Sequence, residues 1–158
     1  MMGFFEEIVV GEERRLGAHT FTKEAIIAFA RRYDPQRFHV DEEAAKDSIF
    51  GGLCASGWHT AAAAMRAIVD HRTRSLAERT ARGEALPPLG VSPGVEKLRW
   101  PTPVRPGDVI TFSSRVTDKR ETKRPEWGLV FMRTIGLNQA GQEAISMENR
   151  AFIGRRPG

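Results

Sequence analysis

The strongest constraint on the fold is a long helical pattern in the middle of the chain, from about Cys54 to Ala81. Its apolar residues recur at helical spacing, and its first half is apolar almost all round, with alanine at each of positions 61–64. The second half is mostly polar, and Arg82-Gly83 ends the pattern. Such a helix is expected to be buried where it begins and to emerge into water where it ends.

The part of the chain that follows this helix changes to β-strand patterns. Turn sequences rich in Pro, Gly and Asn separate four such segments. The predicted strands lie near Val95–Trp100, Val109–Thr117, Leu129–Leu137 and Glu143–Phe152. Helices followed by strands are typical of the α+β class. We therefore expect an antiparallel sheet that curls around the long helix.

Three shorter elements are predicted before the long helix. Arg14–Phe21 is a candidate strand. A helix is expected over Thr22–Tyr33, with Thr22 as its N-cap and with an end at Asp34, because the residue before a proline avoids the helical conformation. A short polar helix is expected over Asp41–Asp47, capped by Asp41 itself.

Composition limits the class of protein. The 158 residues, 41% hydrophobic and 28% charged, suit one domain over 1–158 with a core at about 14–152. Cys54 is the single cysteine, which excludes an internal disulfide and a metal site built from cysteines. The longest apolar run is Ala25–Ala30, too short for a membrane helix. Glu6 and Glu7 stand where a signal peptide would carry cations, so the cytoplasm is the expected compartment.

The net charge of +4 comes from cations that are spread along the chain and interleaved with acids. This distribution does not indicate nucleic-acid binding.

A candidate catalytic pair lies where the first helix ends. Asp34 and His39 are five residues apart, and Pro35 forces the chain to turn between them. A turn can bring the carboxylate and the imidazole into one pocket, where they would share a water molecule and move protons. The local sequence leaves an alternative open, in which an Asp-Pro turn ends the helix and His39 lies on the surface.

A second candidate feature is the start of the long helix. Gly57 follows Ser56 there, and the first N–H groups of a helix have no partner within it. These groups and the helix dipole would stabilise a carbonyl oxygen that becomes negative during a reaction. The alternative is that Gly57 only permits close packing.

Together these segments resemble the MaoC-like dehydratases, the group of (R)-specific enoyl-CoA hydratases with a hotdog fold, from about Arg14 to Phe152. The stretches that carry the resemblance are Asp34–His39, Ala55-Ser56-Gly57-Trp58 and PVRPGD at Pro103–Asp108. Gln36, Arg37 and Phe38 differ from the family's usual Asn, Pro and aliphatic residue, which is expected to affect the choice of substrate.

The resemblance implies reversible hydration of trans-2-enoyl-CoA thioesters. Asp34 and His39 would be the catalytic pair, and the Gly57 N–H would be the donor to the oxyanion. Phe38, Ser56 and Trp58 would bind the substrate. No metal and no cofactor other than the coenzyme A of the substrate would be needed. Candidates for the phosphates of coenzyme A are Arg37, Arg66, Arg99, Arg105 and Arg133.

Two other functions stay open at this point. A hotdog acyl-CoA thioesterase would share the buried helix, but would generally lack the Asp-x4-His pair. A non-catalytic hotdog subunit that binds acyl thioesters would retain the fold alone. In each case a homodimer or a higher homo-oligomer is expected, because a curled sheet leaves one edge strand and one side of the helix uncovered.

Overall fold

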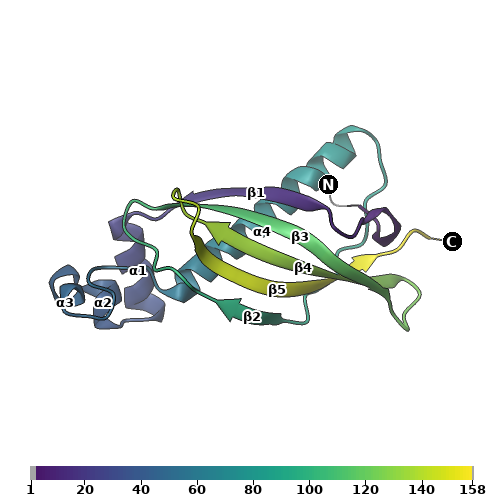
Figure 1. Cartoon of the computed structure of the whole chain (residues 1–158). Coiled ribbons are helices and arrows are strands. Elements are labelled where there is room, and N and C mark those ends of the chain that lie inside the picture. The colour runs from purple at the N-terminus through teal and green to yellow at the C-terminus, as the bar shows by residue number, and fades with distance from the viewer. Residues whose placement is uncertain (1–2, 158) are drawn as a thin grey trace.

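The computed structural model describes residues 3–157. One antiparallel sheet has the strand order β1-β3-β4-β5-β2, and a long helix crosses one of its faces (Figure 1). The strands are β1 (Glu13–Thr20), β2 (Val95–Arg99), β3 (Val109–Glu121), β4 (Trp127–Leu137) and β5 (Glu143–Gly154). The helices are the 3-10 turn η1 (Phe5–Glu7), α1 (Lys23–Tyr33), α2 (Arg37–Val40), α3 (Glu42–Lys46) and α4 (Gly57–Ala81).

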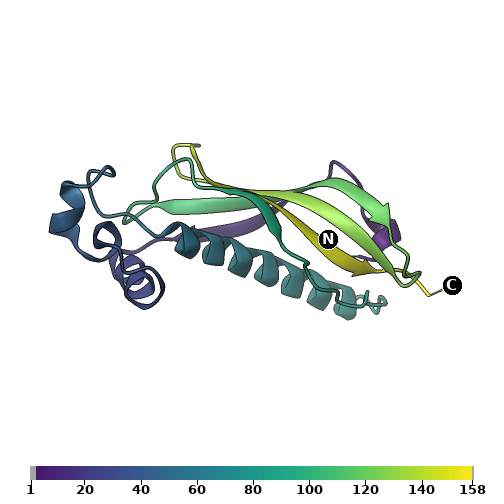
Figure 2. The ribbon, with the colours of Figure 1, turned by 90° about the horizontal axis from the view of Figure 1, so that it is seen from below.

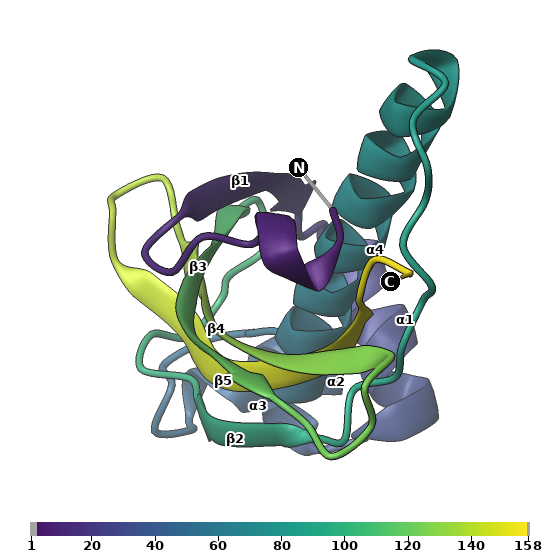
Figure 3. The same cartoon turned by 90° about the vertical axis from the view of Figure 1, so that its right-hand side faces the viewer.

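The sheet curves around the N-terminal part of α4, as Figure 2 shows from below and Figure 3 from one end. The short helices α1, α2 and α3 gather beside the beginning of α4, at one end of the sheet (Figure 1). This architecture confirms the predicted α+β class and the predicted wrapping of the sheet around the long helix. It also places the segment that holds Asp34 and His39 beside the N-terminus of α4.

The main core lies between the sheet and α4. Phe21, Ile26, Ala64, Ile110 and Phe112 are completely buried there. The alanines of α4 have small side chains, so the sheet can approach the helix backbone closely. Within residues 3–157, no helix is long and apolar enough to span a membrane.

The predicted helix caps are confirmed. The Thr22 side chain accepts a hydrogen bond from the backbone N–H of Ala25, at 3.2 Å. The Asp41 side chain accepts hydrogen bonds from the N–H groups of Glu43 and Ala44, both at 3.0 Å. These side-chain acceptors satisfy donors that have no partner in the first turn of a helix.

Two boundaries differ from the prediction by three residues or more. Helix α4 begins at Gly57 instead of Cys54, because Ser56 is its N-cap and the Ala55 N–H is already bonded to the carbonyl of Val104, at 2.8 Å. Strand β3 continues to Glu121, beyond the predicted end at Thr117. The four-residue helix α2 was not predicted, and it occupies the turn between the candidate catalytic residues.

The expectation that the second half of α4 emerges into water is wrong for Ser75 and Arg79, which are 4% and 5% exposed. The N-terminal segment covers this part of the helix, and the Arg79 guanidinium lies 2.8 Å from a carboxylate oxygen of Glu7. A buried arginine is tolerated here because a carboxylate compensates its charge.

Candidate active site

The candidate catalytic pair is assembled by the turn between α1 and α2. Asp34 is the C-cap of α1, and His39 lies in α2, three residues after Gln36. His39 Nε2 lies 3.5 Å from Asp34 Oδ2, and the side chains of His39 and Asp34 are 7% and 18% exposed. The structure therefore brings the two residues together, and it excludes the alternative in which His39 is a surface residue.

A backbone carbonyl group fixes the orientation of the His39 ring. Its Nδ1 lies 2.7 Å from the carbonyl oxygen of Cys54, and a carbonyl can only accept a hydrogen bond. The hydrogen of the neutral ring is therefore on Nδ1, and Nε2 is free to exchange protons on the side that faces Asp34. Cys54 is a buried residue whose thiol pKa is raised by burial, as suits a structural cysteine.

Asp34 is held by two further hydrogen bonds. The Ser56 hydroxyl donates to Oδ2 at 2.7 Å, and the Gln36 side-chain amide donates to Oδ1 at 2.8 Å. Burial alone would raise the pKa of Asp34, but these two hydrogen bonds and the attraction to His39 together lower it below its ordinary value. The carboxylate is thus ionised at neutral pH.

Replacing Ser56 with Ala is expected to raise the pKa of Asp34, because one of the hydrogen bonds that favour its charged form is lost. The acidic limb of the pH–activity profile should move to higher pH. The protein should also lose roughly 1 kcal/mol of stability, since Ser56 is the N-cap of α4. The pH profile of kcat/KM and a denaturant titration measure the two effects. Ser48→Ala, in a loop outside the pair, is the control, and an unmoved acidic limb in Ser56→Ala would contradict the prediction.

Gly57 is the first residue of α4, and its N–H makes no hydrogen bond with the part of the chain that the structure describes. The ring of Trp100 covers this glycine so closely that a Cβ at position 57 would lie 2.6 Å from two ring atoms. Glycine is therefore required for packing, as the alternative reading expected. Within residues 3–157, a helix N-terminal N–H thus has no hydrogen-bond partner, and it belongs to a residue that lines the same cavity as the candidate catalytic pair.

Asp34, His39 and Gly57 line one cavity of about 350 Å³. Of the residues predicted for the site, Asp34, Phe38, His39, Gly57 and Trp58 line it. Ser56 does not line the cavity: it is completely buried and contacts Asp34 from behind. The lining also includes residues that the sequence did not single out for the site, namely Gln36, Phe50, Cys54, Ala55, Thr60, Trp100, Thr102, Pro103, Val104 and Ala144.

Hydrogen bonds from the Arg105 side chain hold the loop of residues 50–53, which leads toward α4. Its Nη1 donates to the carbonyls of Gly52 at 2.7 Å and Leu53 at 3.2 Å, and its Nη2 donates to the carbonyl of Phe50. This guanidinium is thus used inside the fold. The loop it holds includes Phe50, which lines the cavity, and continues into Cys54, whose carbonyl orients His39.

His59 lies outside the cavity that Asp34 and His39 line. Its ring stacks on Phe29 with a centroid distance of 4.6 Å, contacts Phe21 at 4.9 Å and is 8% exposed. Burial, with a smaller contribution from nearby His19, lowers its pKa from 6.5 to about 4. His59 is therefore neutral in the folded protein at neutral pH.

Lowering the pH is expected to lower the free energy of unfolding, because His59 binds a proton more readily in the unfolded chain than in the folded one. Below pH 6.5 the unfolded chain gains a proton at this residue, whereas the folded chain does so only near pH 4. The contribution of His59 to the free energy of unfolding is complete above pH 6.5 and falls by about 3 kcal/mol as the pH drops to about 4. Denaturant unfolding of the protein and of His59→Phe, which keeps an aromatic ring against Phe29, measures this slope. An equal slope in both proteins would contradict the assignment.

The architecture is that of the hotdog proteins. A hypothetical protein from Mycobacterium tuberculosis, described as a double hotdog fold, superimposes with a TM-score of 0.73 over 99% of this chain and 45% of its own, at 14% identity. That likeness concerns the fold alone.

The sequence also matches the MaoC like domain family over residues 7–130, and the chain belongs to this family. The crystal structure of the MaoC-like dehydratase from Rhodospirillum rubrum superimposes with a TM-score of 0.81, at 38% identity, over 98% of this chain and 99% of that one.

Two curated relatives are longer proteins. Protein MaoC of Klebsiella aerogenes is 32% identical over 78% of this chain, and the match spans 36% of its own length. The mesaconyl-CoA hydratase of Cereibacter sphaeroides is 35% identical over 40% of this chain and 18% of its own length. The chain thus spans only about a third of the first of these relatives, and less of the second. The predicted membership of the MaoC-like dehydratases is confirmed.

Proposed function

We propose that this protein catalyses the reversible addition of water to trans-2-enoyl thioesters of coenzyme A. The observation that carries the proposal is the meeting of three groups around one cavity: the Asp34 carboxylate, the Nε2 of His39 and the unpaired N–H of Gly57. Membership of a family of dehydratases, and the similarity of one segment to a CoA-ester hydratase, support the same reaction.

In the proposed reaction, Asp34 and His39 hold the water. An ionised Asp34 and an unprotonated Nε2 are both acceptors, so one water molecule between them can donate a hydrogen to each. The lone pairs of its oxygen are then directed toward C3 of the enoyl group. The pair takes a proton from the water and supplies one to C2 on the same face, which gives syn addition. Because the two groups interact so closely, they act as one proton-transfer unit.

The Gly57 N–H would receive the thioester oxygen. As water adds to C3, negative charge moves through C2 to that oxygen, and a fixed N–H at a helix N-terminus stabilises it. Adding water changes no net oxidation state, so the proposal calls for no redox cofactor. Among residues 3–157, no three His, Cys, Asp or Glu side chains gather into a metal site.

Two arginines are candidates for the phosphates of coenzyme A. The side chains of Arg37 and Arg99 are exposed and make no ion pair or hydrogen bond within the described part of the chain, and the two residues adjoin the cavity-lining residues Phe38 and Trp100 in sequence. Arg66 and Arg133, by contrast, face the carboxylates of Asp70 and Glu143, at 2.8 and 3.5 Å, and Arg105 is occupied by backbone carbonyls. We therefore place the phosphates at Arg37 and Arg99.

The deciding experiment tests a panel of enoyl-CoA and 3-hydroxyacyl-CoA thioesters as substrates. For each thioester, the change in enoyl absorbance and the release of free CoA are measured. Reversible interconversion without CoA release is the expected result. Release of CoA would establish a thioesterase instead. A panel that binds but is not turned over would establish a non-catalytic subunit.

We also propose a homodimer. Among residues 3–157, strand β2 pairs only with β5, so the other side of this strand is an open sheet edge. Two apolar side chains are also exposed: Val95 in β2 itself is 42% exposed, and Met65 in α4 is 44% exposed. A second copy would cover this edge and these side chains. Light scattering behind a sizing column at micromolar concentration should give the mass of two chains, and the mass of one chain would contradict the proposal.

A further inference from the structure

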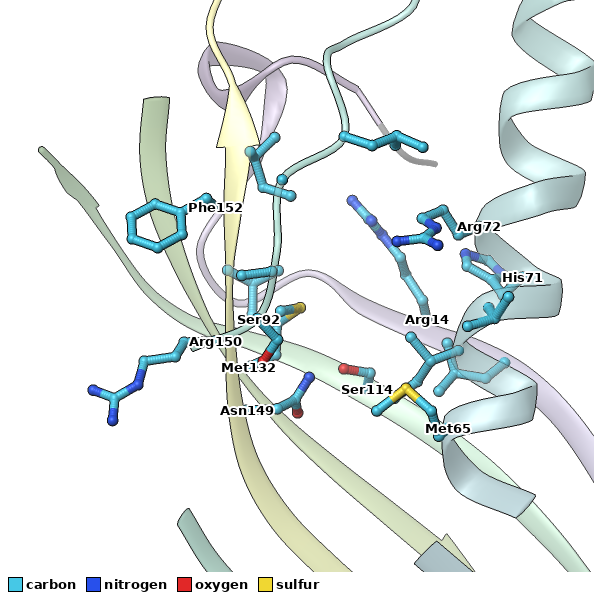
Figure 4. A pocket seen from close by; sticks show the side chains of 18 of the residues that line it. Arg14, Met65, His71, Arg72, Ser92, Ser114, Met132, Asn149, Arg150 and Phe152 are labelled. Atoms are coloured by element: carbon cyan, nitrogen blue, oxygen red, sulfur yellow. The ribbon is translucent and has the colours of Figure 1, made fainter. Parts of the chain in front are cut away.

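Arg105 belongs to the segment PVRPGD at Pro103–Asp108, and the reaction proposed above gives this arginine no role. Arg105 does not line the cavity of Asp34 and His39, nor the cavity between α4 and the sheet that Figure 4 shows. It therefore does not contact a substrate bound in either place. Its guanidinium binds backbone carbonyls of the 50–53 loop instead, so any influence on the site must pass through that loop.

The 50–53 loop depends on this guanidinium. The loop lies outside every helix and strand of residues 3–157. Within the same residues, no backbone N–H donates to the carbonyls of Phe50, Gly52 or Leu53. Arg105 donates to all three, because its N–H groups are arranged in a rigid fork. Removing this side chain would leave the three carbonyls without their donor.

The last of these carbonyls belongs to the peptide group that joins Leu53 to Cys54. Arg105 Nη1 donates to the Leu53 oxygen at 3.2 Å, and the Cys54 N–H at the other end of the same peptide group donates to the carbonyl of Phe38, also at 3.2 Å. A peptide group is planar, so bonds at both ends fix the orientation of the whole plane.

The next peptide group, between Cys54 and Ala55, is the one that orients His39. Its carbonyl oxygen lies 2.7 Å from His39 Nδ1, and its N–H donates to the carbonyl of Val104 at 2.8 Å. Val104 and Arg105 are neighbours in one turn. This turn therefore holds the peptide groups on both sides of Cys54.

The turn that carries Val104 and Arg105 is itself well supported. The Asp108 carboxylate accepts hydrogen bonds from the Arg105 N–H and from the side-chain amide of Gln139, both at 2.7 Å. The Phe21 N–H donates to the Asp108 carbonyl at 2.8 Å. These bonds fix the turn to other parts of the chain, so the guanidinium holds the 50–53 loop against a fixed support.

We propose that Arg105 is a positioning residue for His39. By holding the 50–53 loop, it keeps the Cys54 carbonyl directed at Nδ1 of His39. The hydrogen of the neutral ring then stays on Nδ1, and Nε2 remains the atom that exchanges protons with the water. The consequence for catalysis rests on the function proposed above, whereas the place of the hydrogen can be measured without any turnover.

The first test observes the tautomer of His39 by ¹⁵N NMR of protein labelled at histidine. The chain has four histidines, and comparison with His39→Asn identifies the signals of His39. When the ring is neutral, the unmodified protein should carry the hydrogen on Nδ1 alone. In Arg105→Gln, one amide cannot bind three carbonyls. The Cys54 carbonyl is then less well held, and a mixture of both tautomers is expected.

The second test measures turnover of an enoyl-CoA. In Arg105→Gln, kcat should fall roughly tenfold to 100-fold, because a small displacement of Nε2 slows proton transfer. KM should change by less than about threefold, since Arg105 lines neither cavity. Arg105→Lys keeps a charged donor but lacks the fork, so its kcat and its tautomer mixture should lie between those of the other two proteins.

Arg74→Gln is the matched control. Arg74 also donates to a backbone carbonyl, that of Leu16, at 2.9 Å, and it lines neither cavity. This variant should keep the single tautomer of His39 and the kcat of the unmodified protein. Thermal unfolding shows that each variant is folded, and Arg105→Lys supplies the same comparison where Arg105→Gln does not fold.

A single Nδ1 tautomer in the folded Arg105 variants would overturn the proposal. An equal fall in kcat for Arg105→Gln and Arg74→Gln would do so as well, because it would indicate general loosening of the fold. A protein that hydrates none of the thioesters would refute the proposed function instead, and the tautomer of His39 would still decide the role of Arg105.

Discussion

Asp34→Asn is expected to lower kcat for enoyl-CoA hydration by roughly 100- to 10,000-fold. The amide has nearly the same shape as the carboxylate, so the hydrogen bond from Ser56 can be kept while the negative charge and the basicity are lost. The folded state should be little affected, because Asp34 lies in a turn at the edge of the cavity. Steady-state kinetics and thermal unfolding of the same preparation measure both effects.

His39 needs a substitution that respects its buried hydrogen bond. His39→Ala would leave the Cys54 carbonyl without its donor, whereas His39→Asn can place an amide N–H near the position of Nδ1. A loss of activity as large as that of Asp34→Asn is expected, since the Nε2 that exchanges protons is gone. Asp47→Asn, an exposed carboxylate outside the site, is the control. Near-normal turnover in either catalytic variant would show that the pair is wrongly assigned.

Removing the Gly57 N–H is the second change with a large expected effect. Position 57 is the first residue of α4, where proline is well accepted, and Ser56 has the extended ψ of 140° that a residue before proline adopts. Trp100 must be removed first, because any Cβ at this position would lie 2.6 Å from its ring. The informative pair is therefore Gly57→Ala and Gly57→Pro, each in a Trp100→Ala background.

The two double variants present a Cβ at the same place, but only the alanine keeps the N–H. The proline variant is expected to have a kcat roughly 100- to 1,000-fold lower, the usual cost of losing one donor to an oxyanion. Helix content by circular dichroism should be the same in both, since the N–H at this position has no partner in the helix. Equal kcat values would show that Gly57 serves packing alone.

Local sequence signals predicted the parts of the site that depend on neighbours in the chain. Pro35 ends α1 and turns the chain, so the approach of His39 to Asp34 was foreseeable. The four-residue helix α2 was not, because a single turn leaves no periodic pattern in the sequence. The bond from Gln36 to Asp34 depends on the reach of one side chain across the turn, which spacing alone does not give.

Contacts between distant segments account for the rest. The covered end of α4 depends on Glu7, which is 72 positions from Arg79, and neither residue carries a local signal for the other. Trp100 was predicted as the last residue of a strand, yet it follows the end of β2 and lies over Gly57. The start of α4 at Gly57 likewise depends on the bond between Ala55 and Val104, which only the folded chain brings together.

The hydrogen bonds from Arg105 to the 50–53 loop limit the ways in which a substrate can enter the cavity. A segment whose carbonyls share one guanidinium cannot swing aside as a lid without breaking several charged hydrogen bonds together. We therefore expect that wall of the cavity to stay in place when a ligand binds. Entry and exit would then fall to the part of the wall formed by Trp58 and Trp100, whose indole rings meet edge to face at 5.4 Å and are 58% and 40% exposed. Rotation of these two indole rings, rather than opening of the 50–53 loop, would then control the exchange of ligands.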